Sequence, residues 1–459
     1  MFNGITKALS DLFKKEKREG ILYFYFRYLV QYKKWVYSYI ITYSKKTSVR
    51  SILKVSIGNS LAAAIGIIGT MVQARLVGPV DLGYLRQFGI ISSYAFFLHL
   101  GIWHALQRLY PLYLGEGKRD RALAVAQICQ SWNIGIATFI SGVFTIMAFI
   151  EMINGNWRAS LAWCVQIVAM MYNFYGGYLN ATYRSGRDFQ TASKSSIISS
   201  ITALFSLPFF LIWPYIGMIL RSTIGSIASL LYLHRNRPLK LAWRFNWREW
   251  YNLLKEGLPL FTASYVVGMG WYAVEATLVV TFYNTTALGL WSISIMFFEM
   301  AKIMPQTIVA IYIPKLMYHF GQNKNTRDSL YYCKKPMFFG MLGTLGVLVI
   351  LYFVLPLAIQ ILAPKYVDAI STMRLVMLQL PILILEIPLT ILIAKGDTLQ
   401  QNISSISGLL IFSILAFINY RLGFSFNGII IASCIGRICR IVISYCFIYL
   451  TSFKESNIN

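Results

Sequence analysis

Twelve apolar stretches follow one another through most of the chain, and this pattern decides the fold class. Each is about 20 residues or longer, enough to cross the hydrocarbon core of a bilayer as a helix. The composition agrees, because 57% of the 459 residues are hydrophobic, 13% are charged and the mean hydropathy is +0.58. A soluble domain carries about 25% charged residues, so a water-soluble protein is excluded and we predict an all-α polytopic membrane protein. The stretches cover approximately residues 52–76, 83–106, 123–150, 159–182, 190–212, 214–233, 256–281, 287–313, 336–360, 370–394, 400–420 and 427–451.

Positive charge gathers on one side of this arrangement. The net charge is +25, from 42 Lys and Arg against 17 Asp and Glu. If the amino terminus is cytoplasmic, the inner loops and termini hold 31 of the basic residues, whereas the outer loops hold only Arg158, Lys365 and Arg421. The positive-inside rule then predicts that both termini are cytoplasmic. One missed span would move every later loop to the opposite side of the membrane, so the charge asymmetry also supports a count of twelve spans.

The first fifty residues differ from the rest, because aromatic and basic residues alternate there without an uninterrupted apolar core. They are not a signal peptide. They fit either a helix on an anionic membrane surface or a solvated basic tail, and both interpretations stay open. We predict five segments: a cytoplasmic or interfacial basic aromatic segment (1–50), a first six-helix bundle (51–234), a basic cytoplasmic linker (235–255), a second six-helix bundle (256–452) and a cytoplasmic tail (453–459).

Several function classes are disfavoured. The predicted outer loops are short, whereas an enzyme that polymerises or ligates sugars at the outer face would need a substantial external segment. The sequence has no GxxxxGK[ST] nucleotide-binding loop, and its six cysteines follow no metal spacing. A membrane-embedded glycosyl- or acyltransferase would need a paired acidic or histidine site on a loop, and none emerges. We therefore expect a secondary transporter or lipid translocase without a resident cofactor or metal.

The two halves of the sequence form an internal repeat. Residues 72–120 can be laid on residues 278–325 at an offset of 206, which aligns Leu82-Gly83 with Leu288-Gly289. Because each unit would contain six helices, the halves should have the same orientation and form a parallel repeat. Substrate sites in such folds lie between the halves.

Two motifs carry a family resemblance over residues of about 50–450. Arg75-Leu76-Val77-Gly78-Pro79 with Leu82-Gly83-Tyr84 resembles the A-R-x-L-G-P-x-x-x-G-x-Y signature of polysaccharide biosynthesis proteins, the oligosaccharide repeat-unit flippases. Glu256-Gly257-Leu258-Pro259-Leu260 resembles the G-x-P motif that opens their seventh helix. These proteins belong to the multidrug/oligosaccharidyl-lipid/polysaccharide exporter superfamily. The long basic amino-terminal segment departs from their usual pattern.

The resemblance implies two six-helix bundles around a central cavity that works by alternating access in a bacterial cytoplasmic (inner) membrane. The implied substrate is an oligosaccharide linked to a polyprenyl pyrophosphate of the undecaprenyl type, for surface polysaccharide such as O-antigen or exopolysaccharide. Polysaccharide polymerase and export proteins are candidate partners, and no nucleic acid is expected.

Charges inside the spans are the candidate site residues, because each costs at least about 2.5–3.5 kcal/mol at the bilayer centre. Arg221 and Arg437 lie deep in helices 6 and 12, which are equivalent under the repeat, and Arg440 lies one turn beyond Arg437. A guanidinium binds phosphate through a fork of donors, so these arginines suit a pyrophosphate, although inter-helix ion pairs would also explain them. The substrate-binding candidates are Arg221, Arg437, Arg440, Arg75, Lys302 and Arg374.

Carboxylates suggest a second role. Glu299 and Lys302 share one helix face at i, i+3 spacing and should neutralise each other. Asp81 and Arg86 either stiffen the turn after the first span, with Asp81 paired to an arginine, or form part of an outer gate. The candidates for coupling to H⁺ or Na⁺ are Glu275, Glu299 and Glu386.

The main rival function is a cation-coupled multidrug or small-molecule antiporter, which would need a cavity dominated by carboxylates. Seven cations stand against four carboxylates within or beside the spans, and this balance favours an anionic substrate. The cations are Arg75, Arg86, Arg221, Lys302, Arg374, Arg437 and Arg440, and the carboxylates are Asp81, Glu275, Glu299 and Glu386.

Overall fold

The computed structural model describes residues 47–186, 188–323 and 325–456. The chain divides into two compact units, residues 1–58 and 59–459, and only the start of one helix in the first unit is described. The second unit is described below. Most of the predicted basic aromatic segment and the last three residues lie outside the described residues.

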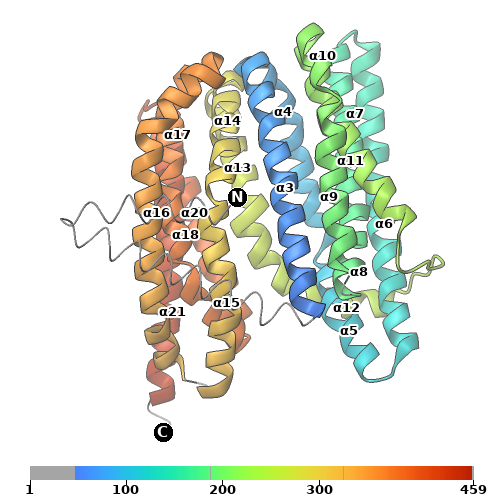
Figure 1. Cartoon of the computed structure of the whole chain (residues 1–459), viewed down its shortest axis with the longest axis vertical. Coiled ribbons are helices and arrows are strands. Elements are labelled where there is room, and N and C mark those ends of the chain that lie inside the picture. The colour runs from blue at the N-terminus through green and yellow to red at the C-terminus, as the bar shows by residue number, and fades with distance from the viewer. Residues whose placement is uncertain (1–46, 187, 324, 457–459) are drawn as a thin grey trace, which may run out of the picture. The chain divides into compact units, whose positions relative to one another are not determined.

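The first half of the described chain consists of six helical segments, labelled in Figure 1. Three of them are interrupted by short 3₁₀ or π turns or by a bend. The segments are α3 (Thr47–Leu76); α4 (Pro79–Ala95) with α5 (Ile102–Gly115); α6 (Arg119–Ile153); α7 (Trp157–Met171) with α8 (Gly177–Ser185); α9 (Phe189–Leu204) with α10 (Leu207–Ile212); and α11 (Pro214–Arg235).

Six more segments follow after the linker 236–246. They are α12 (Trp247–Tyr265) with α13 (Trp271–Phe282); α14 (Thr285–Ala301) with α15 (Ile303–Asn323); α16 (Thr326–Leu362); α17 (Ile370–Met377), α18 (Gln379–Ile384) and α19 (Thr390–Lys395); α20 (Thr398–Arg421); and α21 (Asn427–Ser456). The predicted all-α fold with twelve helical segments is therefore confirmed.

Eight helical segments of the described chain are long and apolar enough to cross a membrane, and the bent pair α12–α13 makes a ninth. The other three are α3, whose Leu61–Leu76 is apolar, the interrupted α7–α8, and α14–α15, whose Thr285–Ala301 is apolar. Interruptions shorten the continuous helices of α7–α8 and α14–α15, whereas α3 is uninterrupted and its apolar part is Leu61–Leu76. Breaks inside a membrane are tolerated where neighbouring helices cover the freed backbone groups.

The second segment breaks where two consecutive residues adopt left-handed backbone conformations. Leu100 has a φ of 52° and Gly101 a φ of 75°, between α4 and α5. The Nδ1 atom of the buried His99 accepts a hydrogen bond from the Gly101 amide at 2.7 Å. Glycine adopts positive φ without the steric cost of a side chain, which makes this a defined turn within the span.

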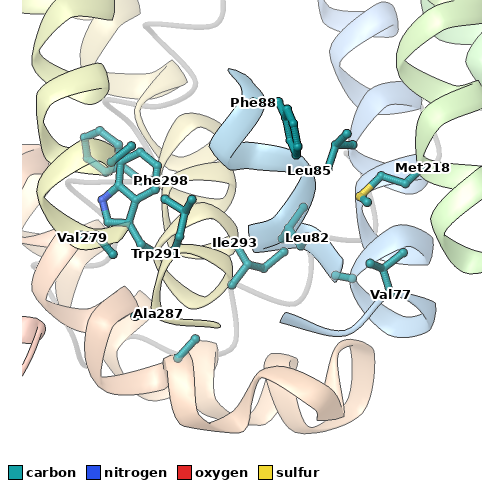
Figure 2. Packing of buried hydrophobic residues seen from close by; sticks show 14 of the residues in the cluster. Val77, Leu82, Leu85, Phe88, Met218, Val279, Ala287, Trp291, Ile293 and Phe298 are labelled. Carbon is teal, nitrogen blue, oxygen red and sulfur yellow. The ribbon is translucent and has the colours of Figure 1, made fainter. Parts of the chain in front are cut away.

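Packing between the halves centres on α4 and α14. One hydrophobic cluster includes Leu82, Leu85 and Phe88 of α4 together with Trp291 and Ile293 of α14, and Figure 2 shows them facing the same core. Helices α5 and α12 form a second contact between the halves. The halves therefore meet on both sides of the polar region described below.

The repeated Leu-Gly pairs lie against each other at the α4–α14 contact. A Cβ atom added to Gly83 would overlap the Thr285 carbonyl oxygen, and one added to Gly289 would overlap the Pro79 carbonyl oxygen. Small residues allow such close backbone approach, which is the main source of helix association in lipid. Because Gly83 and Gly289 correspond under the 206-residue offset, the repeat meets itself at this reciprocal contact. We call it the outer contact, since the topology predicts this end to be extracytoplasmic.

Candidate functional site

Two adjoining hollows lie between the halves. The first has a volume of about 500 Å³ and is lined by α3, α4, α7, α9 and α11, with Met269 and Met296 from the second half. The second, of about 330 Å³, is lined by α4, α13 and α14. Both are bordered by Arg86, Gly89 and Ser93, so they meet along one face of α4. This is the place where a parallel repeat is expected to hold its substrate.

The first hollow is cationic. Among the described residues, two charged side chains line it, Arg86 and Arg221, and no carboxylate does. The other polar groups are neutral amides and hydroxyls: Gln73, Ser92, Ser93, Gln166, Asn173, Ser199, Ser200 and Ser222. The hollow therefore offers positive charge together with neutral hydrogen-bonding groups.

Arg221 carries an uncompensated charge. Its guanidinium donates hydrogen bonds to the Gln73 side-chain oxygen, to the Thr70 hydroxyl at 2.9 Å and to the Gly66 carbonyl at 3.1 Å. All three partners belong to α3 and are neutral. In the part of the chain that the structure describes, the alternative of an ion pair between Arg221 and a glutamate does not occur. The bonds hold the guanidinium against α3 while its charge stays available to an anion.

Arg86 projects into both hollows. Its side chain is exposed, and within the described part of the chain it forms no ion pair. Asp81 and Arg86 are predicted together at the turn after the first span, but in the structure Asp81 pairs with a different arginine. Residues five apart on a helix point about 140° away from each other, so Arg86 turns away from Asp81.

Asp81 pairs instead with Arg158, at the start of α7. The Arg158 guanidinium lies over the ring of Tyr215, with 4.5 Å between its central carbon and the ring centroid, and the Tyr215 hydroxyl donates to the Arg158 carbonyl at 2.7 Å. Sequence reasoning missed this partner, because Arg158 was counted only as an outer-loop base. Arg75 is exposed at the end of α3.

Glu299 is the carboxylate of the second hollow, which is also lined by Tyr272 and Trp291. As predicted from their spacing, Glu299 and Lys302 form an ion pair. Lys302 is also 5.9 Å from the Tyr272 ring centroid. The second hollow is therefore bordered by Glu299, whose charge is neutralised by Lys302, and by the unpaired guanidinium of Arg86.

Arg437 lies in the interior of the second half and lines neither hollow. Its side chain is 5% exposed, and the guanidinium carbon is 4.6 Å from the ring centroid of Trp271 and 5.4 Å from that of Tyr272. The equivalence of helices 6 and 12 does not extend to their arginines, because Arg221 faces the cavity and Arg437 is covered by aromatic rings.

A buried carboxylate, Glu275, lies in the same interior and is fully inaccessible. It accepts hydrogen bonds from the Trp291 indole at 3.0 Å and from the Ser433 hydroxyl at 3.2 Å. Ser433 in turn accepts a bond from the Trp271 indole at 2.8 Å. Glu275 thus contacts a ring that lines the second hollow, and no cation of the described chain lies within ion-pair distance of it.

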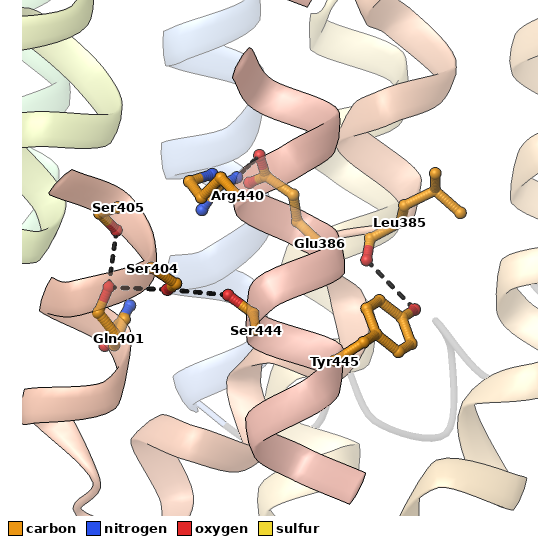
Figure 3. A network of polar contacts seen from close by, with 8 residues as sticks. All are labelled: Leu385, Glu386, Gln401, Ser404, Ser405, Arg440, Ser444 and Tyr445. Carbon is orange, nitrogen blue, oxygen red and sulfur yellow. Dashed lines mark hydrogen bonds and ion pairs between the residues drawn. The ribbon is translucent and has the colours of Figure 1, made fainter. Parts of the chain in front are cut away.

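The remaining candidates are engaged away from the hollows. Arg440 of α21 pairs with Glu386, beside a serine network that joins α20 to α21 through Ser404 and Ser444, 2.9 Å apart (Figure 3). Arg374 donates to the Tyr352 carbonyl at 3.2 Å and lies over the Tyr352 ring. These contacts engage each side chain away from the hollows. Roles in substrate binding for Arg437, Arg440 and Arg374 stay predictions.

A second close contact lies toward the predicted cytoplasmic end. A Cβ atom added to Gly101 would overlap the Gly257 carbonyl oxygen, and one added to Gly257 would overlap that of Gly101. Close by, Arg108 of α5 and Glu256 of α12 form an exposed ion pair at 2.8 Å. We call this the inner contact. Gly257 belongs to the motif that resembles G-x-P, and the close approach of the two backbones explains why this position of the motif is a glycine.

No protein-family model matches the sequence, and no curated protein matches it either. Solved structures match the fold. A multidrug resistance MATE family transporter of the MOP superfamily, in an inward-facing conformation, aligns with a TM-score of 0.68 and 13% identity over 88% of this chain and 99% of its own. The lipid II flippase MurJ, in an inward closed conformation, aligns with a TM-score of 0.66 and 16% identity over 85% of this chain and 86% of its own.

A third structure is a MOP superfamily transporter from Pyrococcus furiosus whose description notes a reverse polarity of its binding pocket. It aligns with a TM-score of 0.58 and 13% identity over 87% of this chain and 95% of its own. All three are described as transporters or flippases. The described part of the chain therefore has a fold similar to those of the MATE transporters and of MurJ.

Proposed function

We propose that the protein is a flippase for oligosaccharides linked to a polyprenyl pyrophosphate. The observation that carries the proposal is the first hollow, where Arg86 and Arg221 stand without a carboxylate. A pyrophosphate needs such donors, and its desolvation inside a membrane protein is favourable only against opposite charge. The neutral amides and hydroxyls around them suit the hydroxyl groups of a sugar.

The dimensions are consistent with a headgroup rather than a whole lipid. Hollows of about 500 and 330 Å³ fall in the range of ordinary small-molecule sites, about 300–1,000 Å³. We infer that the pyrophosphate and the first sugars enter the hollows while the polyprenyl tail stays in the bilayer. The outer and inner contacts then part alternately, in the manner of an alternating-access transporter.

We further propose that Glu275 couples transport to an H⁺ or Na⁺ gradient. Of the three predicted coupling carboxylates, Glu299 is paired with Lys302 and Glu386 with Arg440, whereas Glu275 has only neutral hydrogen-bond donors. A change in its charge would act on Trp291, which it holds and which borders the second hollow. The buried carboxylate is thereby connected to the substrate site through one side chain.

A cation-coupled antiporter for small organic cations is the second candidate. Glu299 favours it, because a carboxylate on the wall of the second hollow could hold a cation once Lys302 swings away. Arg86 opposes it, since an unpaired guanidinium borders the same hollow.

The test is reconstitution into proteoliposomes with a fluorescent polyprenyl-pyrophosphate oligosaccharide, followed by its flipping between leaflets. Arg86→Gln and Arg221→Gln should each lower substrate affinity by about 10- to 150-fold, because a hydrogen bond to a charged group contributes about 1.5–3 kcal/mol. Arg421→Gln is the matched control, since it removes one exposed arginine at the end of α20 that contacts the Phe417 ring and lines neither hollow. Transport of tetraphenylphosphonium with no flipping of the labelled lipid would instead establish the antiporter.

A further inference from the structure

The linker between the halves is held along α6. The Gln130 side chain donates to the Leu241 carbonyl at 3.4 Å, and the Arg244 amide donates to the Ser131 hydroxyl at 3.2 Å. The rings of Trp132 and Phe245 stack with their centroids 6.3 Å apart. The linker therefore has a fixed course on the surface of the first half.

Aromatic rings line its outward face. Trp243, Trp247 and Tyr251 are 62%, 67% and 52% exposed. Trp247 and Tyr251 are one helical turn apart at the start of α12, so they share one face of that helix. Exposed tryptophans and tyrosines of this kind are typical of the membrane–water interface.

Exposed cations alternate with these rings. Lys240 precedes Trp243, Arg244 follows it, and Arg248 follows Trp247. Arg244 lies 3.5 Å from Glu249, which leaves Lys240 and Arg248 as the cations with no ion pair among the described contacts. We call residues 240–251 the linker strip.

The position of the linker strip along the membrane normal follows from its contact with α6. The Trp243 ring lies 4.0 Å from the position of a Cβ on Gly135. From Gly135 to the end of α6 at Ile153 is 18 residues, about 27 Å of helix, close to the hydrocarbon thickness of about 30 Å. The large exposed apolar side chains of α6 all lie within that stretch, beginning at Phe139. Trp243 therefore marks the edge of the hydrocarbon, and the neighbouring cations stand at headgroup level.

We propose that the linker strip is a binding site for anionic phospholipid headgroups in the predicted cytoplasmic leaflet. The rings insert at the edge of the hydrocarbon, and Lys240 and Arg248 contact the phosphates. Cations beside a membrane surface contribute about fivefold each to binding of anionic lipid. Because α12 continues from the strip to Glu256 and Gly257, a bound lipid would hold the element that forms the inner contact.

The test uses the full-length protein in nanodiscs of phosphatidylcholine that contain brominated phosphatidylglycerol or, separately, brominated phosphatidylcholine. Bromine quenches nearby tryptophans, so the brominated phosphatidylglycerol should quench more, and Trp243→Phe/Trp247→Phe should remove the excess. Lys240→Gln/Arg248→Gln should weaken phosphatidylglycerol binding about 25-fold, from two fivefold contributions. The matched control, Lys334→Gln/Lys335→Gln, removes two exposed cations from another predicted cytoplasmic position and should leave the excess unchanged.

Equal quenching by the two brominated lipids would overturn the proposal, because the strip would then have no preference for an anionic headgroup. An equal loss in the control variant would overturn it as well, since general positive charge would explain the binding. The readout is lipid binding, so it is independent of whether the protein transports a lipid-linked oligosaccharide.

Discussion

The outer contact offers a quantitative test of alternating access. In Gly83→Ala, the new methyl group would lie 2.8 Å from the Thr285 carbonyl carbon and 2.9 Å from the Gly289 amide nitrogen, besides overlapping the Thr285 oxygen. Ordinary van der Waals separation is about 3.5 Å or more, and the closest contact, to the Thr285 oxygen, would fall short of it by far more than these two, so α4 and α14 must separate locally by more than about 1 Å. Overpacking of this kind costs about 1–3 kcal/mol.

That cost falls on the conformation in which α4 and α14 touch, so it should shift the population toward an outward-open state by about 5- to 150-fold. The assay introduces a cysteine at Ser93, which borders both hollows, in a background without the six natural cysteines. The rate of labelling by a membrane-impermeant maleimide from the outer face should rise by at least about fivefold.

The control is Gly142→Ala on α6, where an added Cβ would meet no atom within 4 Å. It should label at the parent rate. If Gly83→Ala is monodisperse, unfolds at the parent temperature and labels no faster, the outer contact is not the barrier to the hollows and the reasoning is refuted.

Three further predictions follow from the same contacts. Arg108→Glu should weaken the inner contact modestly, by about 0.2–1 kcal/mol for an exposed pair, and Glu256→Arg in addition should restore it, measured by labelling of the Ser93 cysteine from the opposite face. Glu275→Gln should keep substrate binding but abolish the response of flipping to H⁺ and Na⁺ gradients; unchanged gradient dependence in proteoliposomes would exclude coupling through this residue. Asp81→Asn should leave the Arg158 guanidinium without its carboxylate and lower the midpoint of thermal unfolding, and an unchanged midpoint would show that the pair contributes no stability.

The positions of the spans follow from the sequence because hydropathy averages over about 20 residues and each span is a separate signal. The breaks within them do not. The interruption at Leu100 and Gly101 and the π turn at Tyr172–Gly176 occur inside apolar runs, where one glycine is compatible with a continuous helix. Packing against neighbouring helices determines where these breaks occur.

The sequence indicated that the candidate site would be cationic, but it indicated only some of the residues that line the hollows. Counting residues inward from a span end gives the depth of a charge but not the direction in which it points around the bundle. Arg221 and Arg437 have comparable predicted depths, yet one lines the first hollow and the other is covered by Trp271. Arg86 was assigned to the outer gate because Asp81 is near in sequence, although the helix turns them apart.

The central claim is that Arg86 and Arg221 bind the pyrophosphate of a lipid-linked substrate. The most direct measurement is the affinity of the purified protein for a polyprenyl pyrophosphate, by microscale thermophoresis, for the parent, Arg86→Gln, Arg221→Gln and Arg421→Gln. We predict a loss of about 10- to 150-fold in each of the first two and parent affinity in the third. Parent affinity in both cavity variants, with the proteins folded, would contradict the account.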